Sequence, residues 1–192
     1  MLMLIAGLVL FLGIHSVNML APGWRAGSVA KLGLWGWKGL VAVVSLVGFV
    51  LIVVGYGEAR QQAVWLWTSP VWTRHLAALL MLPAMILLVA TYVPGNRIKA
   101  RVGHPMLLAT KVWALAHLFA NGALHDLLLF GGFLAWSVAG FIIHRRRDRA
   151  AGTRYAAAGI GRDLTTLVVG VVVWALFSFH LHRWLMGVGP FG

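Results

Sequence analysis

Apolar residues form six blocks along the chain, and short segments rich in glycine, proline or charge separate these blocks. A helix needs about 20 apolar residues to cross the hydrocarbon core of a bilayer. The six blocks have about that length or fall slightly short of it, and they cover 3–21, 38–57, 73–93, 105–121, 124–143 and 164–186. The pattern therefore predicts an all-α fold, a polytopic transmembrane helical bundle with about six membrane-spanning helices.

The segments between the blocks contain residues that end helices. Pro22-Gly23, Pro94-Gly95 and Asn121-Gly122 each stand at a boundary, as expected of turn-forming pairs. The fourth and fifth blocks are short and almost contiguous, so we expect them to form a tight antiparallel hairpin. The chain shows no internal repeat and no long linker, which predicts a single integral-membrane domain over 1–192.

The amino-acid composition indicates the same environment. Charged residues make up 10% of the chain and hydrophobic residues 61%, whereas a soluble domain carries about 25% charged residues. We therefore expect the lipid bilayer to surround most of the side chains. The chain has no cysteine, which excludes disulfides, iron–sulfur clusters, thiolate-ligated haem and cysteine catalysis.

Positive charge is distributed unevenly between the loops. Twelve basic residues lie in or beside the first, third and fifth loops: Arg25, Lys31, Lys38, Arg97, Lys99, Arg101, Arg145, Arg146, Arg147, Arg149, Arg154 and Arg162. Only Arg60, Arg74 and Arg183 lie on the other side. Because cytoplasmic loops carry the excess of Lys and Arg, we expect a multi-pass protein of the bacterial inner membrane with both termini periplasmic. No basic stretch is interleaved with stacking aromatic residues, so we expect no nucleic-acid binding.

Acidic residues are scarce and lie near the ends of the predicted spans: Glu58, Asp126, Asp148 and Asp163. Asp126 and Asp163 open helices, where the helix dipole stabilises a carboxylate by about 0.3–1 kcal/mol. No pair of carboxylates and no Ser-His-Asp arrangement is visible in the sequence. The catalytic residues, and whether the protein is an enzyme at all, are therefore left open.

Two of the eight histidines, His15 and His117, fall inside apolar helices. Two imidazoles on separate helices suit the axial positions of a b-type haem, which needs no covalent attachment motif. Trp113 and Asn121 lie one helical turn on either side of His117, so they offer a flat apolar wall and polar support. The alternative is that each histidine only bonds a neighbouring helix.

Depth in the membrane bears on this pair. The predicted spans place the two histidines at depths that differ by about 9 Å, at a rise of about 1.5 Å per residue. His180 lies closer to the depth of His117 and is the next candidate for a second ligand. In favour of His15, Gly7 and Gly13 would let a flat macrocycle approach the backbone of its helix.

The third loop is the densest polar segment. Arg97, Lys99, Arg101 and His104 precede Pro105, which suits the first position of a helix. Donors at a helix N-terminus favour an anion, so we expect Arg97, Arg101 and His104 to hold a haem propionate, a phosphate or a nucleotide cofactor. The alternative is an orienting loop that faces phospholipid.

Several motifs in order resemble the NnrU family of bacterial membrane proteins over essentially the whole chain. They are GIHSV, WKGLVAVVSLVGFVLIVVGYGEAR, YVPGNRIKARVGHPMLL and KVWALAHLFANG. The resemblance implies a role near nitrite and nitric-oxide reduction, since family members lie near denitrification genes. It also makes components of those reductases candidate partners.

The plant 15-cis-zeta-carotene isomerase is similar to the same family. The resemblance implies haem b ligated by a histidine of a HisSer motif and by one of a LeuAlaHis motif thirteen residues after a HisPro motif. This chain has His15-Ser16, and Leu115-Ala116-His117 follows His104-Pro105 at that spacing. The isomerase has a cysteine where this chain has Ala114, so a ligand switch through that cysteine is absent. The HisPro loop is also similar to that of isoprenylcysteine-type membrane methyltransferases.

The residues and the family resemblance together imply a haem b-binding integral membrane protein linked to denitrification, acting in electron transfer, haem handling or sensing, with His15 and His117 as metal ligands. Three alternatives stay open. They are a haem-dependent cis–trans isomerase of a polyene, a methyltransferase-like membrane enzyme, and a cofactor-free assembly factor.

Overall fold

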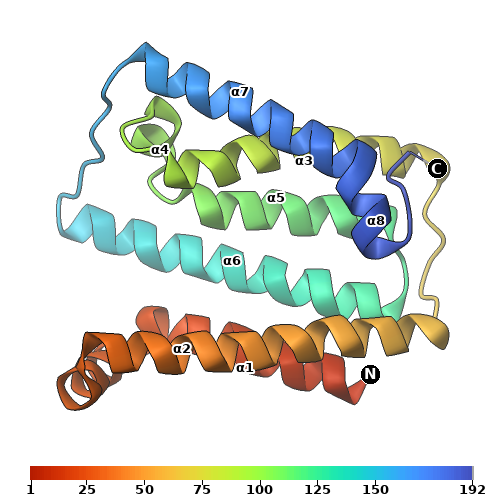
Figure 1. Cartoon of the computed structure of the whole chain (residues 1–192), viewed down its shortest axis with the longest axis horizontal. Helices are drawn as coiled ribbons and strands as arrows, with labels where there is room; N and C mark the ends of the chain where they lie inside the picture. Colours follow the sequence, from red (N-terminus) through yellow and green to blue (C-terminus); the bar gives the residue numbers. More distant parts are fainter. Residues whose placement is uncertain (192) are drawn as a thin grey trace. The chain divides into compact units, whose positions relative to one another are not determined.

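The chain is built almost entirely of helices, and the computed structural model describes residues 1–191 (Figure 1). The helices are α1 (Leu2–Leu20), α2 (Pro22–Gln61), α3 (Val71–Tyr92), α4 (Arg97–Val102), α5 (Pro105–Ala120), α6 (Leu124–Ala150), α7 (Ile160–Leu176), the π-helix η1 (Phe177–Leu181) and α8 (His182–Met186). Over the described residues no strand forms, and Trp65 and Ala123 share only an isolated β-bridge. The predicted all-α fold class is confirmed.

Within residues 1–191, five helical stretches are long and apolar enough to cross a membrane: α1, α2, α3, α6 and the continuous stretch Ile160–Met186. The remaining predicted span forms α5, which has 16 residues and therefore measures about 24 Å. That length falls short of the roughly 30 Å of a bilayer's hydrocarbon core. The protein is a polytopic helical membrane protein in which five of the six predicted spans have full membrane-crossing length.

The helix boundaries differ from the predicted spans where a helix continues past the apolar block. The helix α2 begins at Pro22 rather than near residue 38, and Gly33 interrupts it with φ 73° and ψ 165°. Such a positive φ suits glycine. The third loop also contains the short helix α4, which the apolar pattern did not indicate. Apolar blocks mark what enters lipid, whereas helices extend further wherever local propensity allows.

The chain forms two compact units. Unit 1 consists of Met1–Leu66 and Ala123–Gly132, and unit 2 consists of Trp67–Gly122 and the residues from Phe133 on. The first part of α6, up to Gly132, therefore belongs to unit 1, and the rest of α6 belongs to unit 2. The single domain predicted over 1–192 stays a prediction.

Unit 1 is held together by close packing of α1 on α2. A Cβ added to Gly7 would lie 2.6 Å from the amide nitrogen of Ile52, and one added to Gly48 would lie 2.8 Å from that of Phe11. A Cβ on Gly55 would collide with the backbone of Leu4. Without a hydrophobic driving force between helices in lipid, small residues that let backbones approach provide the packing energy.

In unit 2, α3 packs against both α5 and α7 (Figure 1). The contact with α7 is close at Gly170, where an added Cβ would lie 2.8 Å from Ile86 Cα. Trp174 Nε1 donates to the carbonyl of Ala78 across the same contact at 2.9 Å. This bond lies one turn before Pro83, where the helix lacks a backbone donor.

The loops of unit 2 meet at the two ends of α3. At its C-terminal end, the amide of Ala158 donates to the carbonyl of Gly95 at 2.8 Å. At its N-terminal end, the amide of Trp67 donates to the carbonyl of Gly122 at 3.2 Å. The third and fifth loops thus share one end of unit 2, as a chain that crosses a bilayer repeatedly requires.

Candidate functional site

His15 lies on α1 in unit 1, and its ring is oriented by the helix backbone. Its Nδ1 lies 2.6 Å from the carbonyl oxygen of Phe11. A carbonyl oxygen only accepts hydrogen bonds, so Nδ1 carries the proton and Nε2 keeps the lone pair of the neutral ring. The Phe11 ring packs beside the imidazole, with centroids 4.4 Å apart.

The two glycines expected to open this helix to a macrocycle differ in the structure. The packing of α1 on α2 occupies the Gly7 position, where an added Cβ would meet the backbone of Ile52 and Gly48. The expectation that Gly7 lets a macrocycle approach the backbone is therefore wrong, because α2 packs against α1 at this glycine. At Gly13 an added Cβ meets no atom within 4 Å, and this glycine leaves the backbone beside His15 accessible.

His117 lies near the end of α5 in unit 2 and repeats the arrangement of His15. Its Nδ1 lies 2.8 Å from the carbonyl oxygen of Trp113, so its Nε2 also keeps the lone pair. The centroid of the Trp113 ring lies 5.4 Å from that of the imidazole, and the role of this ring as an apolar wall stays a prediction. Asn121 is the C-cap of α5, and its amide donates to the backbone carbonyl of His117 at 2.9 Å. Its bond therefore supports the helix end that carries His117.

The predicted ligands His15 and His117 belong to different units, so their pairing stays a prediction. Within unit 2, the structure brings a different histidine to His117. The rings of His117 and His182 have centroids 6.5 Å apart and planes inclined by 22°. The sequence made His180, not His182, the next candidate after His15. The π-helix before His182 shifts the register of the residues that follow it, and no recognisable sequence pattern marks a π-helix.

His104 of the third loop forms a polar cluster with His144 and Asp148 of α6 and with Tyr155 of the fifth loop. His104 Nε2 lies 2.8 Å from Asp148 Oδ2, and the Tyr155 hydroxyl donates to the same oxygen at 3.1 Å. The ring of His144 lies 5.0 Å from that of His104. Burial, reinforced by the neighbouring Asp148 carboxylate, raises the pKa of Tyr155. The tyrosine therefore remains a hydrogen-bond donor, and the cluster ties the start of α5 to the end of α6.

The predicted anion-binding residues are arranged differently from a shared pocket of donors. Arg97 pairs with Asp163, with Nε and Oδ2 3.4 Å apart, and its backbone amide donates to Oδ1 at 2.6 Å. His104 is bonded to Asp148, while Arg101 is exposed. Two of the three residues thus hold carboxylates of the chain itself, and an external anion at this loop stays a prediction.

A buried cluster in unit 1 was not indicated by the sequence. The Tyr56 hydroxyl on α2 donates to Asp126 Oδ1 at 2.5 Å, and the amide of Ala123 donates to Oδ2 at 3.0 Å. His125 Nε2 lies 3.6 Å from the same carboxylate. The contact from Ala123 fits the expected role of Asp126 at the opening of a helix. The bond to Tyr56 links two helices distant in sequence, which helical spacing alone does not reveal.

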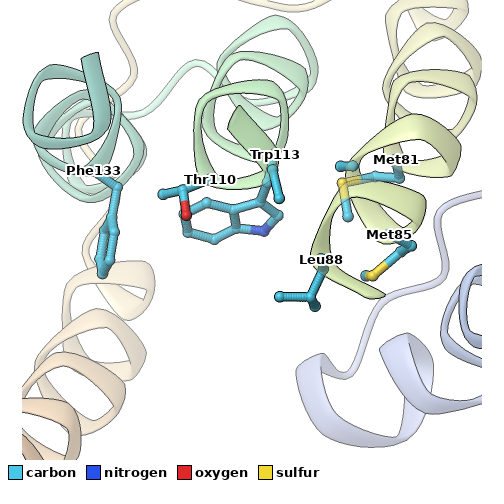
Figure 2. Close-up of a pocket in the computed structure, with 8 residues that line it drawn as sticks. Met81, Met85, Leu88, Thr110, Trp113 and Phe133 are labelled. Atoms are coloured by element: carbon cyan, nitrogen blue, oxygen red, sulfur yellow. The ribbon is translucent and has the colours of Figure 1, made fainter. Parts of the chain in front are cut away.

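An apolar pocket of about 180 Å³ lies between α3, α5 and α6 in unit 2. In Figure 2 the Trp113 indole lies between Met81, Met85 and Leu88 of α3 and Phe133 of α6. Trp113 and Phe133 meet edge to face, with centroids 5.4 Å apart. Ala109, Thr110 and Trp113 line the pocket from α5, the helix that carries His117.

The chain matches a known protein family. The NnrU protein family matches residues 3–190. Neither the curated proteins nor the solved structures gave a match. The match spans nearly the whole chain, including the motifs around both His15 and His117, so this polytopic membrane protein belongs to the NnrU family.

Proposed function

We propose that this membrane protein binds haem b, which the imidazole of His117 would hold, and the sequence motifs predict His15 as the second ligand. The observation that carries the proposal is the shared orientation of the two rings. Each Nδ1 donates to the carbonyl four residues earlier. A metal-ligating histidine usually donates its other ring N–H to such an acceptor, which fixes the tautomer and raises ligand basicity.

The donors fit the cofactor. Neutral imidazoles with the lone pair on Nε2 are suitable haem ligands, and the cysteine-free chain offers no thiolate in competition. Bound haem supplies one-electron redox chemistry and an iron that takes small ligands. The chain's own residues orient the imidazoles, through the carbonyls of Phe11 and Trp113. We propose Arg101, which is exposed on α4, as a cation for an anionic group such as a phosphate.

The role proposed for this haem is electron transfer, haem handling or sensing linked to nitrite and nitric-oxide metabolism, alongside reductase components. The absorption spectrum of the purified protein tests the cofactor. Haem b gives a Soret band, with sharp α and β bands when two imidazoles ligate the reduced iron. A protein without a Soret band, even after incubation with haemin, would support the cofactor-free assembly factor.

A second candidate function, a haem-dependent isomerase of a polyene, is favoured by the apolar pocket. We expect a polyene added to the detergent-solubilised protein to show a shifted visible absorption. Ala109→Phe places a larger side chain in the pocket. This variant should weaken polyene binding at least about tenfold, because a filled pocket leaves no room for the polyene. Leu115→Phe, on the exposed face of the same helix, is the control and should bind as the wild type does. Equal binding by both variants argues against the pocket.

We propose the bacterial inner membrane as the location, with the basic loops in the cytoplasm and both termini periplasmic. The meeting of the third and fifth loops at one end of unit 2 supports this arrangement. A reporter active only in the periplasm should be active when fused after the final residue. The same reporter inserted between Arg149 and Arg154 should be inactive. The reverse pattern of activities contradicts the orientation.

A further inference from the structure

The π-helix η1 (Phe177–Leu181) sets the direction of the histidine that follows it. The amide of His182 donates to the carbonyl of Phe177, five residues earlier. Each residue of an α-helix turns the chain by about 100°, so one extra residue in a turn rotates everything beyond it by about that angle. Such π-bulges occur frequently at functional sites. Here the bulge brings His182 to His117.

Both rings use Nδ1 in a hydrogen bond to a backbone carbonyl. His182 Nδ1 lies 2.7 Å from the carbonyl oxygen of Val188, and His117 Nδ1 lies 2.8 Å from that of Trp113. Each carbonyl can only accept, so both neutral rings carry the lone pair on Nε2. Phe177 packs edge to face on His182, with centroids 5.9 Å apart, and so restrains the ring.

The separation of the two rings matches that of two imidazoles on one metal. Metal–nitrogen distances of about 2 Å place the centroids of two opposed imidazoles about 6 Å apart. The centroids of His117 and His182 are 6.5 Å apart, with planes inclined by only 22°. The neighbouring His180 lies within the π-helix and is exposed.

We infer that His182 is the second iron ligand at the His117 site, in the axial position that the sequence motifs assign to His15. The inference rests on the proposed haem function. Two protein ligands are enough for haem, because the porphyrin supplies the others. An all-protein zinc site needs three or four ligands, and the part of the chain that the structure describes contains no group of three or more ligating side chains.

The experiment compares reduced absorption spectra of the haem-loaded full chain and four single variants. His182→Ala should lose the sharp α and β bands and become high-spin, and added imidazole should restore the low-spin spectrum. His182→Gln should behave in the same way, which guards against a folding defect specific to alanine. His180→Ala is the matched control in the adjoining turn, and His15→Ala tests the competing ligand. Both should remain low-spin.

The outcomes separate the inference from the proposal beneath it. Wild-type protein that takes up no haem refutes the proposed function, and this result appears before any variant is made. A low-spin spectrum retained by His182→Ala and lost by His15→Ala overturns the inference and leaves the haem proposal standing. Loss in His182→Ala alone, with recovery on adding imidazole, supports His182 as the ligand.

Discussion

Haem should be lost from the protein when His117 is replaced by alanine. His117 belongs to both possible ligand pairs, since the sequence motifs pair it with His15 and the structure brings it to His182. Changes in residues that merely support a ligand lower metal affinity by about 10–100-fold, and removing the ligand itself should exceed that range. We therefore expect the haem content per protein of His117→Ala to fall at least about tenfold.

The control variant is His144→Ala. Its ring packs against His104 in the third-loop cluster, on the side of α5 where the helix begins rather than where His117 lies. This variant should retain wild-type haem content and spectrum. Haem content is measured as the pyridine haemochrome absorbance per mole of purified protein. Retention of haem by His117→Ala would refute the site common to both ligand pairs.

The membrane-spanning architecture could be predicted because lipid imposes a simple requirement on sequence. A crossing segment needs about 20 apolar residues, so the blocks from residue 3 and from residue 73 closely match α1 and α3. The short block from Pro105 likewise became a short helix. Helix ends outside the lipid follow no such requirement, and α2 and α6 therefore extend beyond their predicted spans.

The candidate site could be predicted only as far as its single residues. An imidazole within an apolar block is conspicuous, so the sequence singles out His15 and His117, and helical spacing predicts that Trp113 lies beside His117, as it does. Partners that come from other elements were missed. Asp148 reaches His104 across 44 positions of the sequence, and His182 reaches His117 only through an irregular helical turn. Such contacts depend on tertiary packing between distant segments, which the local pattern of residues in a sequence does not reveal.

Gly7→Leu should unfold unit 1 more readily than any surface change. An added Cβ would lie 2.6 Å from the amide nitrogen of Ile52 and 2.9 Å from the carbonyl carbon of Leu51. Both atoms belong to backbone, which cannot rotate away as a side chain does. Overpacking usually costs about 1–3 kcal/mol, and we expect the upper part of that range because α1 would have to separate from α2.

Gly13→Leu is the matched control on the same helix. An added Cβ at Gly13 meets no atom within 4 Å, so leucine fits there without displacing α2. Replacing glycine in a helix should even add up to about 1 kcal/mol of stability. The midpoint of unfolding in a titration of mixed micelles with a denaturing detergent measures both variants. Gly7→Leu should shift this midpoint to less detergent and Gly13→Leu should not. Equal midpoints would mean that α1 does not pack on α2 through Gly7, and the helix contact that defines unit 1 would have to be assigned to another face.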